Sequence, residues 1–267
     1  MSRYPALFAR LAACGEGAFV PFTTLGDPDL DGSSRVLDAL VAGGADALEL
    51  GLPFSDPVAD GPVIQAADVR ALAAGFRLAD GWRLLRDFRA RQPDLPVGLL
   101  VYANLVLARG IDTFYAAAAA AGVDSVLVAD VPTLEAGPFV AAAHGHGIDP
   151  VLIAPPACRP EVVTRIAQLG QGYTYLVSRP GVTGVDEQAA TDHAALVDRL
   201  AAAGAPPPLL GFGIATPDHV RAARRSGVAG VITGSAVVAR LAAHLDDEPA
   251  RLLALQQYVA TMKAATR

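Results

Sequence analysis

Short apolar runs of five or six residues recur eight times along the chain, and stretches with helical spacing of apolar residues lie between them. Two of these stretches are SRVLDALVAGG at 34–44 and EVVTRIAQLG at 161–170. Alternation of strands with helices is typical of parallel strand pairing. The eight predicted strands are residues 18–22, 47–52, 97–102, 125–130, 150–154, 174–178, 208–213 and 229–234.

Eight strand–helix units within 267 residues match the size of a (β/α)8 barrel. A doubly wound open sheet is the alternative, but it explains eight evenly dispersed strands less well, and no GxGxxG motif follows the first strand. We therefore expect an α/β fold, with a single TIM-barrel domain over residues 1–267. Extra short helices are expected at the N-terminus and after the second and eighth strands.

Composition narrows the functional classes. The net charge of −6 and the lack of a long basic run argue against a nucleic-acid partner. Two cysteines, Cys14 and Cys158, form no CxxC pair, which favours a reducing cytoplasmic location. No apolar run reaches the length of about 18 residues that a membrane helix needs. His144 and His146 end a helical pattern, where a solvated terminus is expected rather than a metal site.

The second strand contains a carboxylate where an apolar residue is expected. In LELGLPFSDPVADGP at 48–62, Glu49 stands between two leucines. Alternation of side chains would turn the leucines toward the helices and Glu49 into the barrel. No basic residue lies anywhere from 36 to 69, so a local partner is absent, although a distant one remains open. A partly desolvated carboxyl at this position should have a raised pKa, which suits a general acid/base.

The loop after this strand adds Asp56 and Asp60. Active sites of (β/α)8 barrels lie at the C-terminal ends of the strands, so Asp60 is expected beside Glu49. Two carboxyl groups there could handle two protons. Ordinary turn chemistry is the alternative for Asp60, which lies in ADGP. For Asp56 we favour loop structure or a partner contact.

Glycine-rich segments follow three late strands. They are SRPGVTG at 178–184, GFGIATPDH at 211–219 and GSAVVARL at 234–241. Backbone N–H groups at a helix N-terminus bind phosphate, and glycine lets the anion approach closely. Each segment alone could be a plain turn, but together they predict a phosphorylated small-molecule ligand. Side chains at strand ends could line the rest of its cavity, with ordinary barrel core as the alternative. The candidates are Phe22, Leu100, Tyr102, Leu127, Ala129, Ile153, Tyr175, Phe212 and Ile232.

These motifs closely resemble the tryptophan synthase α chain family over nearly the whole chain. ELGLPFSDPVADGP at 49–62 is the most specific of them. The others are PFTTLGDPD at 21–29, LLVYANLV at 99–106, GVDSVLVADVP at 122–132, YTYLVSRPGVTG at 173–184, GFGI at 211–214 and GSAVV at 234–238.

The resemblance implies a lyase of tryptophan biosynthesis that cleaves indole-3-glycerol phosphate to indole and glyceraldehyde 3-phosphate by a retro-aldol reaction. It implies Glu49 as general acid/base and Asp60 as the group that holds the indole N–H. No cofactor or metal is expected in this chain. The resemblance also implies an α2β2 complex, in which a β chain carries pyridoxal phosphate and receives indole.

By the same resemblance, other residues are expected to bind the two ends of the substrate. The phosphate is expected on backbone N–H groups around Gly184, Gly213, Gly234 and Ser235. The indole ring is expected among Phe22, Leu100, Leu127, Tyr175 and Phe212. Thr183 would close over the site and hydrogen-bond to Asp60. Pro180 departs from the family pattern in this lid.

Three other functions stay open from the sequence. The first is a stand-alone lyase that releases free indole. The second is a non-catalytic scaffold that only activates a β partner, which the Glu49 and Asp60 pair speaks against. The third is another barrel isomerase that acts on a phosphosugar–anthranilate compound.

Overall fold

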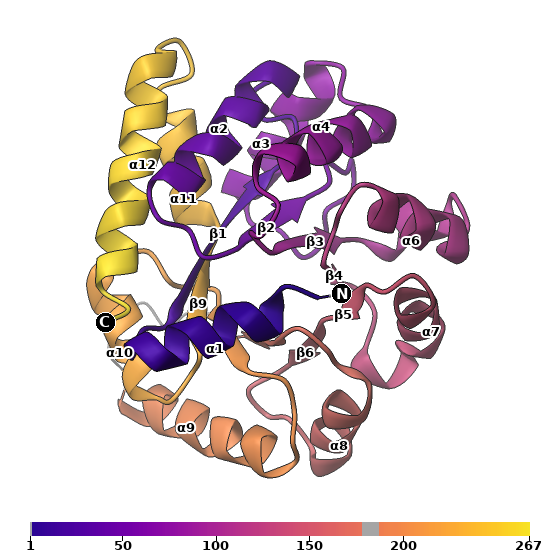
Figure 1. The fold of residues 1–267 in the computed structure, drawn as a ribbon, viewed down its shortest axis with the longest axis vertical. Helices are drawn as coiled ribbons and strands as arrows, with labels where there is room; N and C mark the ends of the chain where they lie inside the picture. The colour runs from indigo at the N-terminus through magenta and orange to yellow at the C-terminus, as the bar shows by residue number, and fades with distance from the viewer. Residues whose placement is uncertain (1, 178–186) are drawn as a thin grey trace.

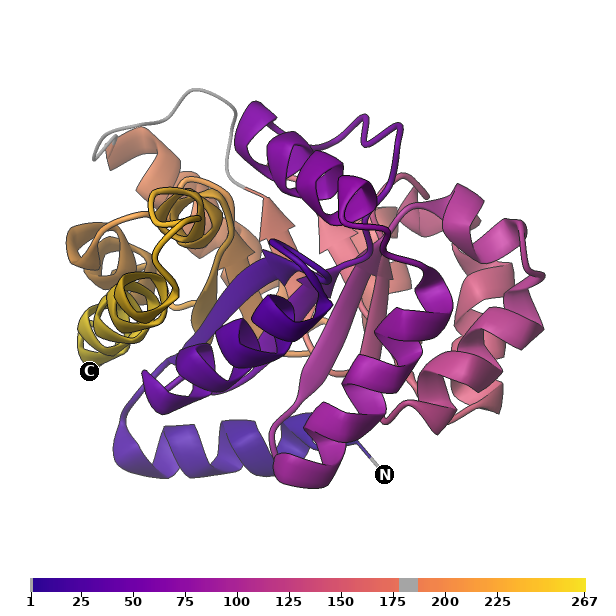
Figure 2. The same cartoon turned by 90° about the horizontal axis from the view of Figure 1, so that it is seen from above.

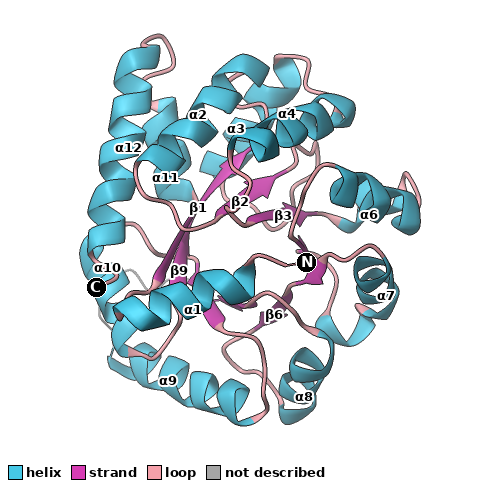
Figure 3. Ribbon diagram, in the orientation of Figure 1, coloured by secondary structure: helices cyan, strands magenta, loops and turns pink. Residues whose placement is uncertain are grey.

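The computed structural model describes residues 2–177 and 187–267, with the side chains of residues 187–192 left out. Figures 1 and 3 show a ring of strands surrounded by helices, which confirms the predicted (β/α)8 barrel. All strand pairs are parallel. The strands are β1 (Ala18–Thr24), β2 (Leu48–Gly51), β3 (Val97–Val101), β4 (Ser125–Val128), β5 (Asp149–Pro150), β6 (Leu152–Ala154), β7 (Thr174–Val177), β8 (Pro208–Gly211) and β9 (Gly230–Thr233).

The fifth predicted strand is divided in two. β5 pairs with β4, whereas β6 pairs with β7, so the chain changes neighbours at Val151. The N–H of Val151 still donates to the carbonyl of Val126 over 3.1 Å. The strand order runs from β5 through β1 and β9 to β6. Because β5 and β6 adjoin in the chain, the barrel is nearly closed.

Helices cover the outside of the barrel and both of its ends. Figure 2 places α1 and α3 at opposite ends, so α1 lies against the N-terminal ends of the strands. The extra helices expected at the N-terminus and after the second and eighth strands are α1, α3 and α11. The helices are α1 (Tyr4–Cys14), α2 (Leu30–Ala42), α3 (Pro62–Ala73), α4 (Leu78–Arg91), α5 (Ala103–Leu107), α6 (Ile111–Ala120), η1 (Thr133–Glu135), α7 (Gly137–Gly145), α8 (Pro160–Leu169), α9 (Glu187–Ala202), α10 (Pro217–Arg225), α11 (Ser235–Ala242) and α12 (Glu248–Ala264).

Local sequence signals set the helix starts near the mouth. Thr216 caps α10, since its hydroxyl oxygen accepts from the N–H of His219 over 3.3 Å and Pro217 takes the first helical position. Asp29 caps α2 in the same way, with a 2.7 Å bond from the N–H of Gly32. None of the helices that the structure describes combines the length and the apolar character of a membrane span.

Strand alternation divides the core into two layers. Leu48, Leu50 and Leu52 pack in the layer between sheet and helices, as their spacing predicts. The inner layer fills the barrel with larger rings, such as Phe22 and Tyr175. One strand therefore supplies both a helix-facing apolar row and an inward row that can carry function.

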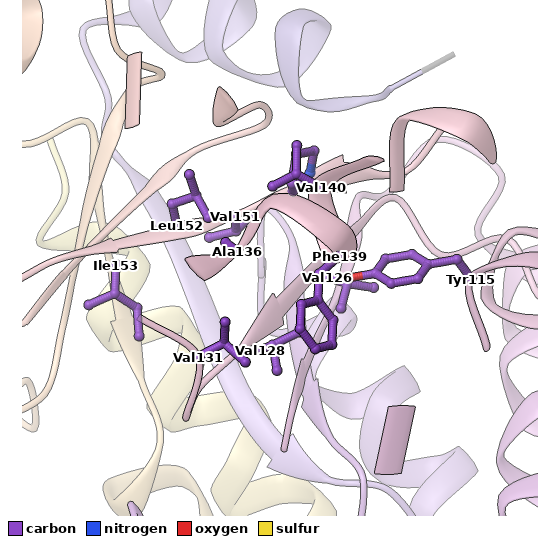
Figure 4. A pocket seen from close by; sticks show the side chains of 11 residues that line it. Tyr115, Val126, Val128, Val131, Ala136, Phe139, Val140, Val151, Leu152 and Ile153 are labelled. Carbon is purple, nitrogen blue, oxygen red and sulfur yellow. The ribbon is translucent and has the colours of Figure 1, made fainter. Parts of the chain in front are cut away.

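A small apolar cavity lies outside the barrel interior, between β4, β6 and the helices α6 and α7 (Figure 4). Its volume is about 20 Å3, room for one water molecule. Tyr115, Phe139 and Ile153 are among the side chains that line it. It lies at the seam where β4 and β6 do not pair.

Candidate active site

A cavity of about 270 Å3 opens at the C-terminal ends of the strands. Segments that follow β2, β8 and β9 form much of its wall, so the strand order brings together loops far apart in sequence. Its lining residues are Phe22, Glu49, Ala59, Asp60, Gly61, Ile64, Leu100, Tyr175, Phe212, Gly213, Ile214, Ala215, His219, Ile232, Gly234, Ser235 and Ala236.

Glu49 is the most deeply buried acid of this cavity, with 1% of its surface exposed. The hydroxyl of Tyr173 donates to its Oε1 over 2.6 Å. Its Oε2 is buried and has no hydrogen-bond partner among the described residues. Burial raises the pKa of Glu49 to about 7, and the Tyr173 hydrogen bond opposes that rise in part. A carboxyl with this pKa can both give and take a proton near neutral pH.

Asp60 is held from the neighbouring strand. The hydroxyl of Tyr102, just after β3, donates to Asp60 Oδ2 over 2.8 Å. The N–H of Ala59 in turn donates to the Tyr102 oxygen over 3.0 Å, which ties the β2 loop to β3. Burial raises the pKa of Asp60, while the Tyr102 hydrogen bond lowers it. Tyr102 therefore positions Asp60 from behind the cavity wall.

A further acid lies near Asp60. Asp68 on α3 is 4% exposed, and its pKa is raised to about 7 by burial first and by the charge of Asp60 second. Asp56, by contrast, is exposed and accepts a 2.6 Å hydrogen bond from the adjacent Ser55 hydroxyl. The structure thus gives Asp56 a local contact in the loop and no place in the cavity wall.

Two inward-facing glycines make room for the rings of the cavity. A Cβ on Gly51 would lie 2.8 Å from the Phe22 ring, too close for any real side chain. A Cβ on Gly211 would collide with the ring and hydroxyl of Tyr175. Glycine at these two strand ends therefore lets Phe22 and Tyr175 stand in the cavity wall.

The other end of the cavity consists largely of backbone. Gly213 has a φ of +74°, and the preceding Phe212 adopts a left-handed φ of +66°, which is uncommon for a residue with a side chain. Gly234 and Ser235 lie at the start of α11, which follows the neighbouring strand β9. Helix starts leave backbone N–H groups without intrahelical partners, so this end can bind an anion.

The structure brings most of the predicted site residues to the cavity. Four do not line it: Tyr102 lies behind Asp60, Leu127 and Ala129 pack with the inner core, and Ile153 lines the small apolar cavity. Pro180, Thr183 and Gly184 lie outside the described residues.

The sequence did not single out seven lining residues or the Glu49 partner Tyr173. Ile64 on α3 could have been predicted, because it lies two residues after the ELGLPFSDPVADGP motif at 49–62. The seven are Ala59, Gly61, Ile64, Ile214, Ala215, His219 and Ala236. Among the described side chains there is no cluster of His, Cys, Asp and Glu that could hold a metal ion.

Fold and site together define a class: an enzyme built on a (β/α)8 barrel, with two carboxyl groups and a helix start in the wall of one cavity. A sequence model of one family, described as "Tryptophan synthase alpha chain", matches residues 8–267. The chain therefore belongs to the tryptophan synthase alpha chain family.

Individual relatives agree with this assignment. The tryptophan synthase alpha chain of Shewanella oneidensis is 57% identical over 265 residues, which cover 99% of this chain and 95% of the relative. The crystal structure of tryptophan synthase subunit alpha from Legionella pneumophila matches with a TM-score of 0.90 and 31% identity, covering 100% of this chain and 98% of that one. A chain of the tryptophan synthase complex from Pyrococcus furiosus matches with a TM-score of 0.81 and 34% identity, covering 92% and 98%.

Proposed function

We propose that this chain is a carbon–carbon lyase that cleaves indole-3-glycerol phosphate to indole and glyceraldehyde 3-phosphate in the last stage of tryptophan biosynthesis. The observation that carries the proposal is Glu49: a buried carboxyl on the cavity wall, with a pKa of about 7 and one oxygen that has no hydrogen-bond partner among the described residues. Membership of the family supplies the substrate.

The reaction needs one proton delivered and one removed. In its protonated form Glu49 gives a proton to C3 of the indole ring, which makes the ring an indolenine and prepares the bond from C3 to the side chain for cleavage. The Glu49 carboxylate then takes the proton of the side-chain hydroxyl as that carbon becomes the aldehyde. The electrons of the broken bond return to the ring, and indole leaves. A pKa near neutrality suits both steps.

Asp60 is assigned the role of stabilising the positive charge that develops on the indole ring. Its carboxylate would accept the indole N–H and stabilise the indolenine, and such charge stabilisation is often a large catalytic contribution. The Tyr102 hydroxyl favours the ionised form of Asp60 that this role requires. The rings of Phe22 and Tyr175 and the side chain of Leu100 would hold the indole.

The phosphate is assigned to the backbone end of the cavity. N–H groups around Gly184, Gly213, Gly234 and Ser235 would donate to its oxygens, and Thr183 would close over the site and hydrogen-bond to Asp60. No cofactor is needed for this chemistry in this chain.

A β partner is supported by the Pyrococcus furiosus relative, which was solved as a tryptophan synthase complex. We propose an α2β2 assembly whose β chain holds pyridoxal phosphate and receives the indole. The loop after β2 suits a contact there, since Val58 is 83% exposed and Asp56 is also at the surface. The cytoplasm is the proposed location, in line with the two free cysteines Cys14 and Cys158.

The test is indole release from indole-3-glycerol phosphate by the purified chain, with and without a tryptophan synthase β chain. We expect weak release alone and a strong rise with the β chain. Full activity alone would favour the stand-alone lyase, and no release under either condition would contradict the proposed reaction. Activation of the β chain without cleavage would point to a scaffold.

A further inference from the structure

One polar side chain from the first turn of α10, the helix after β8, lines the cavity. His219 is the third residue of α10, is half-buried, and lines the cavity together with Gly213 of the preceding loop. Its Nδ1 accepts a 3.3 Å hydrogen bond from the N–H of Ala215. A nitrogen that accepts carries no proton, so the ring proton of neutral His219 is on Nε2. The ring therefore has one nitrogen committed to the loop and a second that can donate.

Charge makes this donor significant. Among the described lining residues there are two carboxyl groups, Glu49 and Asp60, and no lysine or arginine. A phosphate monoester brings further negative charge into the same cavity. Backbone N–H groups at Gly213 and Gly234 supply partial positive charge only. His219 adds a side-chain N–H donor to these backbone groups of the cavity wall.

We propose that His219 is a phosphate-binding residue, whose Nε2–H donates to a phosphate oxygen of the ligand. The proposal rests on the proposed function and deepens it, since it adds a side chain to an anion site otherwise made of backbone. The Ala215 hydrogen bond orients the ring for this contact. A hydrogen bond to a charged group at a half-exposed position contributes about tenfold in affinity.

Two substitutions separate the binding role from the structural one. His219→Asn keeps an acceptor near the position of Nδ1 and removes the donor at the position of Nε2. His219→Gln can place an amide N–H near the position of Nε2. His144→Gln is the matched control, because His144 is exposed at the end of α7.

Binding is measured by calorimetry with two probes. Glycerol 3-phosphate has the phosphate end of the proposed substrate without the ring, and indole has the ring without the phosphate. We expect His219→Asn to weaken glycerol 3-phosphate binding about tenfold and to leave indole binding unchanged. His219→Gln should restore part of the affinity, and His144→Gln should match the wild type. In turnover, His219→Asn should raise KM about tenfold with kcat within about twofold.

Several results would overturn the inference. Wild-type affinity of His219→Asn for glycerol 3-phosphate would remove the proposed contact, and so would a failure of the wild type to bind this probe. Equal losses for indole and glycerol 3-phosphate would show a structural role instead. Wild-type indole release is assayed separately, so a chain that binds the phosphate probe but cleaves nothing contradicts the proposed function and leaves the His219 contact supported.

Discussion

Two buried carboxyl groups, Asp124 at the N-terminal end of the barrel and Glu49 at the C-terminal end, have opposite kinds of partner. At the N-terminal end, Asp124 lies between two arginines, with Arg3 Nη1 and Arg89 Nη2 each 2.7 Å from its oxygens. The N–H of Val97 adds a 2.8 Å hydrogen bond. In the cavity at the other end, the partner of Glu49 among the described residues is the Tyr173 hydroxyl. Glu49 and Asp124 are both nearly fully buried, so the difference lies in their partners.

Asp46 repeats the arrangement at the N-terminal end. Its carboxylate has Lys263 Nζ at 2.8 Å and Arg10 Nη2 at 3.1 Å, and it accepts from the N–H of Phe19. Ion pairs of this kind tie α1 and α12 to the strands. Among the described residues, the side chain of Asp60 in the cavity accepts from the Tyr102 hydroxyl. Asp124 and Asp46 are thus held in ion pairs, whereas Glu49 and Asp60, which accept from tyrosine hydroxyls, have pKa values raised by burial and can exchange protons.

The largest effect is expected for Glu49→Gln, which tests the role of the cavity carboxyl in this contrast. The amide cannot transfer a proton, so we expect indole release to fall about a thousandfold. Thermal stability should not fall, because the substitution removes a buried acid that no cation of the described residues contacts. Activity and melting temperature of the same preparation are the measurements. Wild-type turnover of this variant would contradict the assigned role.

Asp124→Asn should have the reverse effect. It leaves Arg89 largely buried without its carboxylate, so the free energy of unfolding should fall by about 3 kcal/mol, while kcat at 25 °C stays near wild type. Urea unfolding measures the loss. Asp112→Asn is the control: the Asp112 side chain is 87% exposed beside His146, and its loss should cost less than about 1 kcal/mol. Equal effects of the two substitutions would remove the contrast between buried and exposed pairs.

The pH dependence of stability sharpens the contrast further. The pKa of Glu49 rises from 4.5 to about 7 on folding, so the folded state binds this proton more tightly than the unfolded state. The resulting stabilisation is complete below pH 4.5 and is lost as pH rises through about 7. Relative to Glu49→Gln, the wild type should lose about 3 kcal/mol across this window. Urea unfolding of both proteins at stepped pH tests this, and parallel curves would refute the raised pKa.

The smallest expected effect comes from Tyr173→Phe. The lost hydroxyl is the group that lowers the pKa of Glu49, so the pKa should rise further. The Glu49-dependent limb of the kcat/KM profile should move up by about one pH unit at most. Tyr102→Phe serves as a comparison, since it acts on Asp60. A downward shift in Tyr173→Phe would show that Tyr173 does not stabilise the ionised form.

Much of the fold follows from local pattern. The predicted run at 47–52 contains β2, and the run at 174–178 contains β7, because strand alternation and turn glycines are local signals. The division of the run at 150–154 at Val151 was not predictable. It depends on which neighbour each half pairs with, β4 or β7, and pairing is a property of the closed barrel.

The site divides in the same way. Glu49 was detectable because a carboxylate in an apolar strand contradicts its surroundings. Its partner Tyr173 was not, since the two residues are 124 positions apart and only barrel closure brings them together. His219 looked like an ordinary first-turn residue of a helix. Ile153 has the inward phase of a site residue, yet the seam between β4 and β6 places it at the small apolar cavity.

The sequence by itself determined the barrel, the inward direction of Glu49 and the glycine-rich starts of the last helices, because periodicity and backbone freedom are local properties. The tertiary structure decided which acids received cations and which received tyrosines. Pairing and desolvation depend on groups from distant strands, and they set the pKa of Glu49 near 7. The same packing placed His219 in the cavity wall. Neither its residue type nor its spacing along the chain predicted that position.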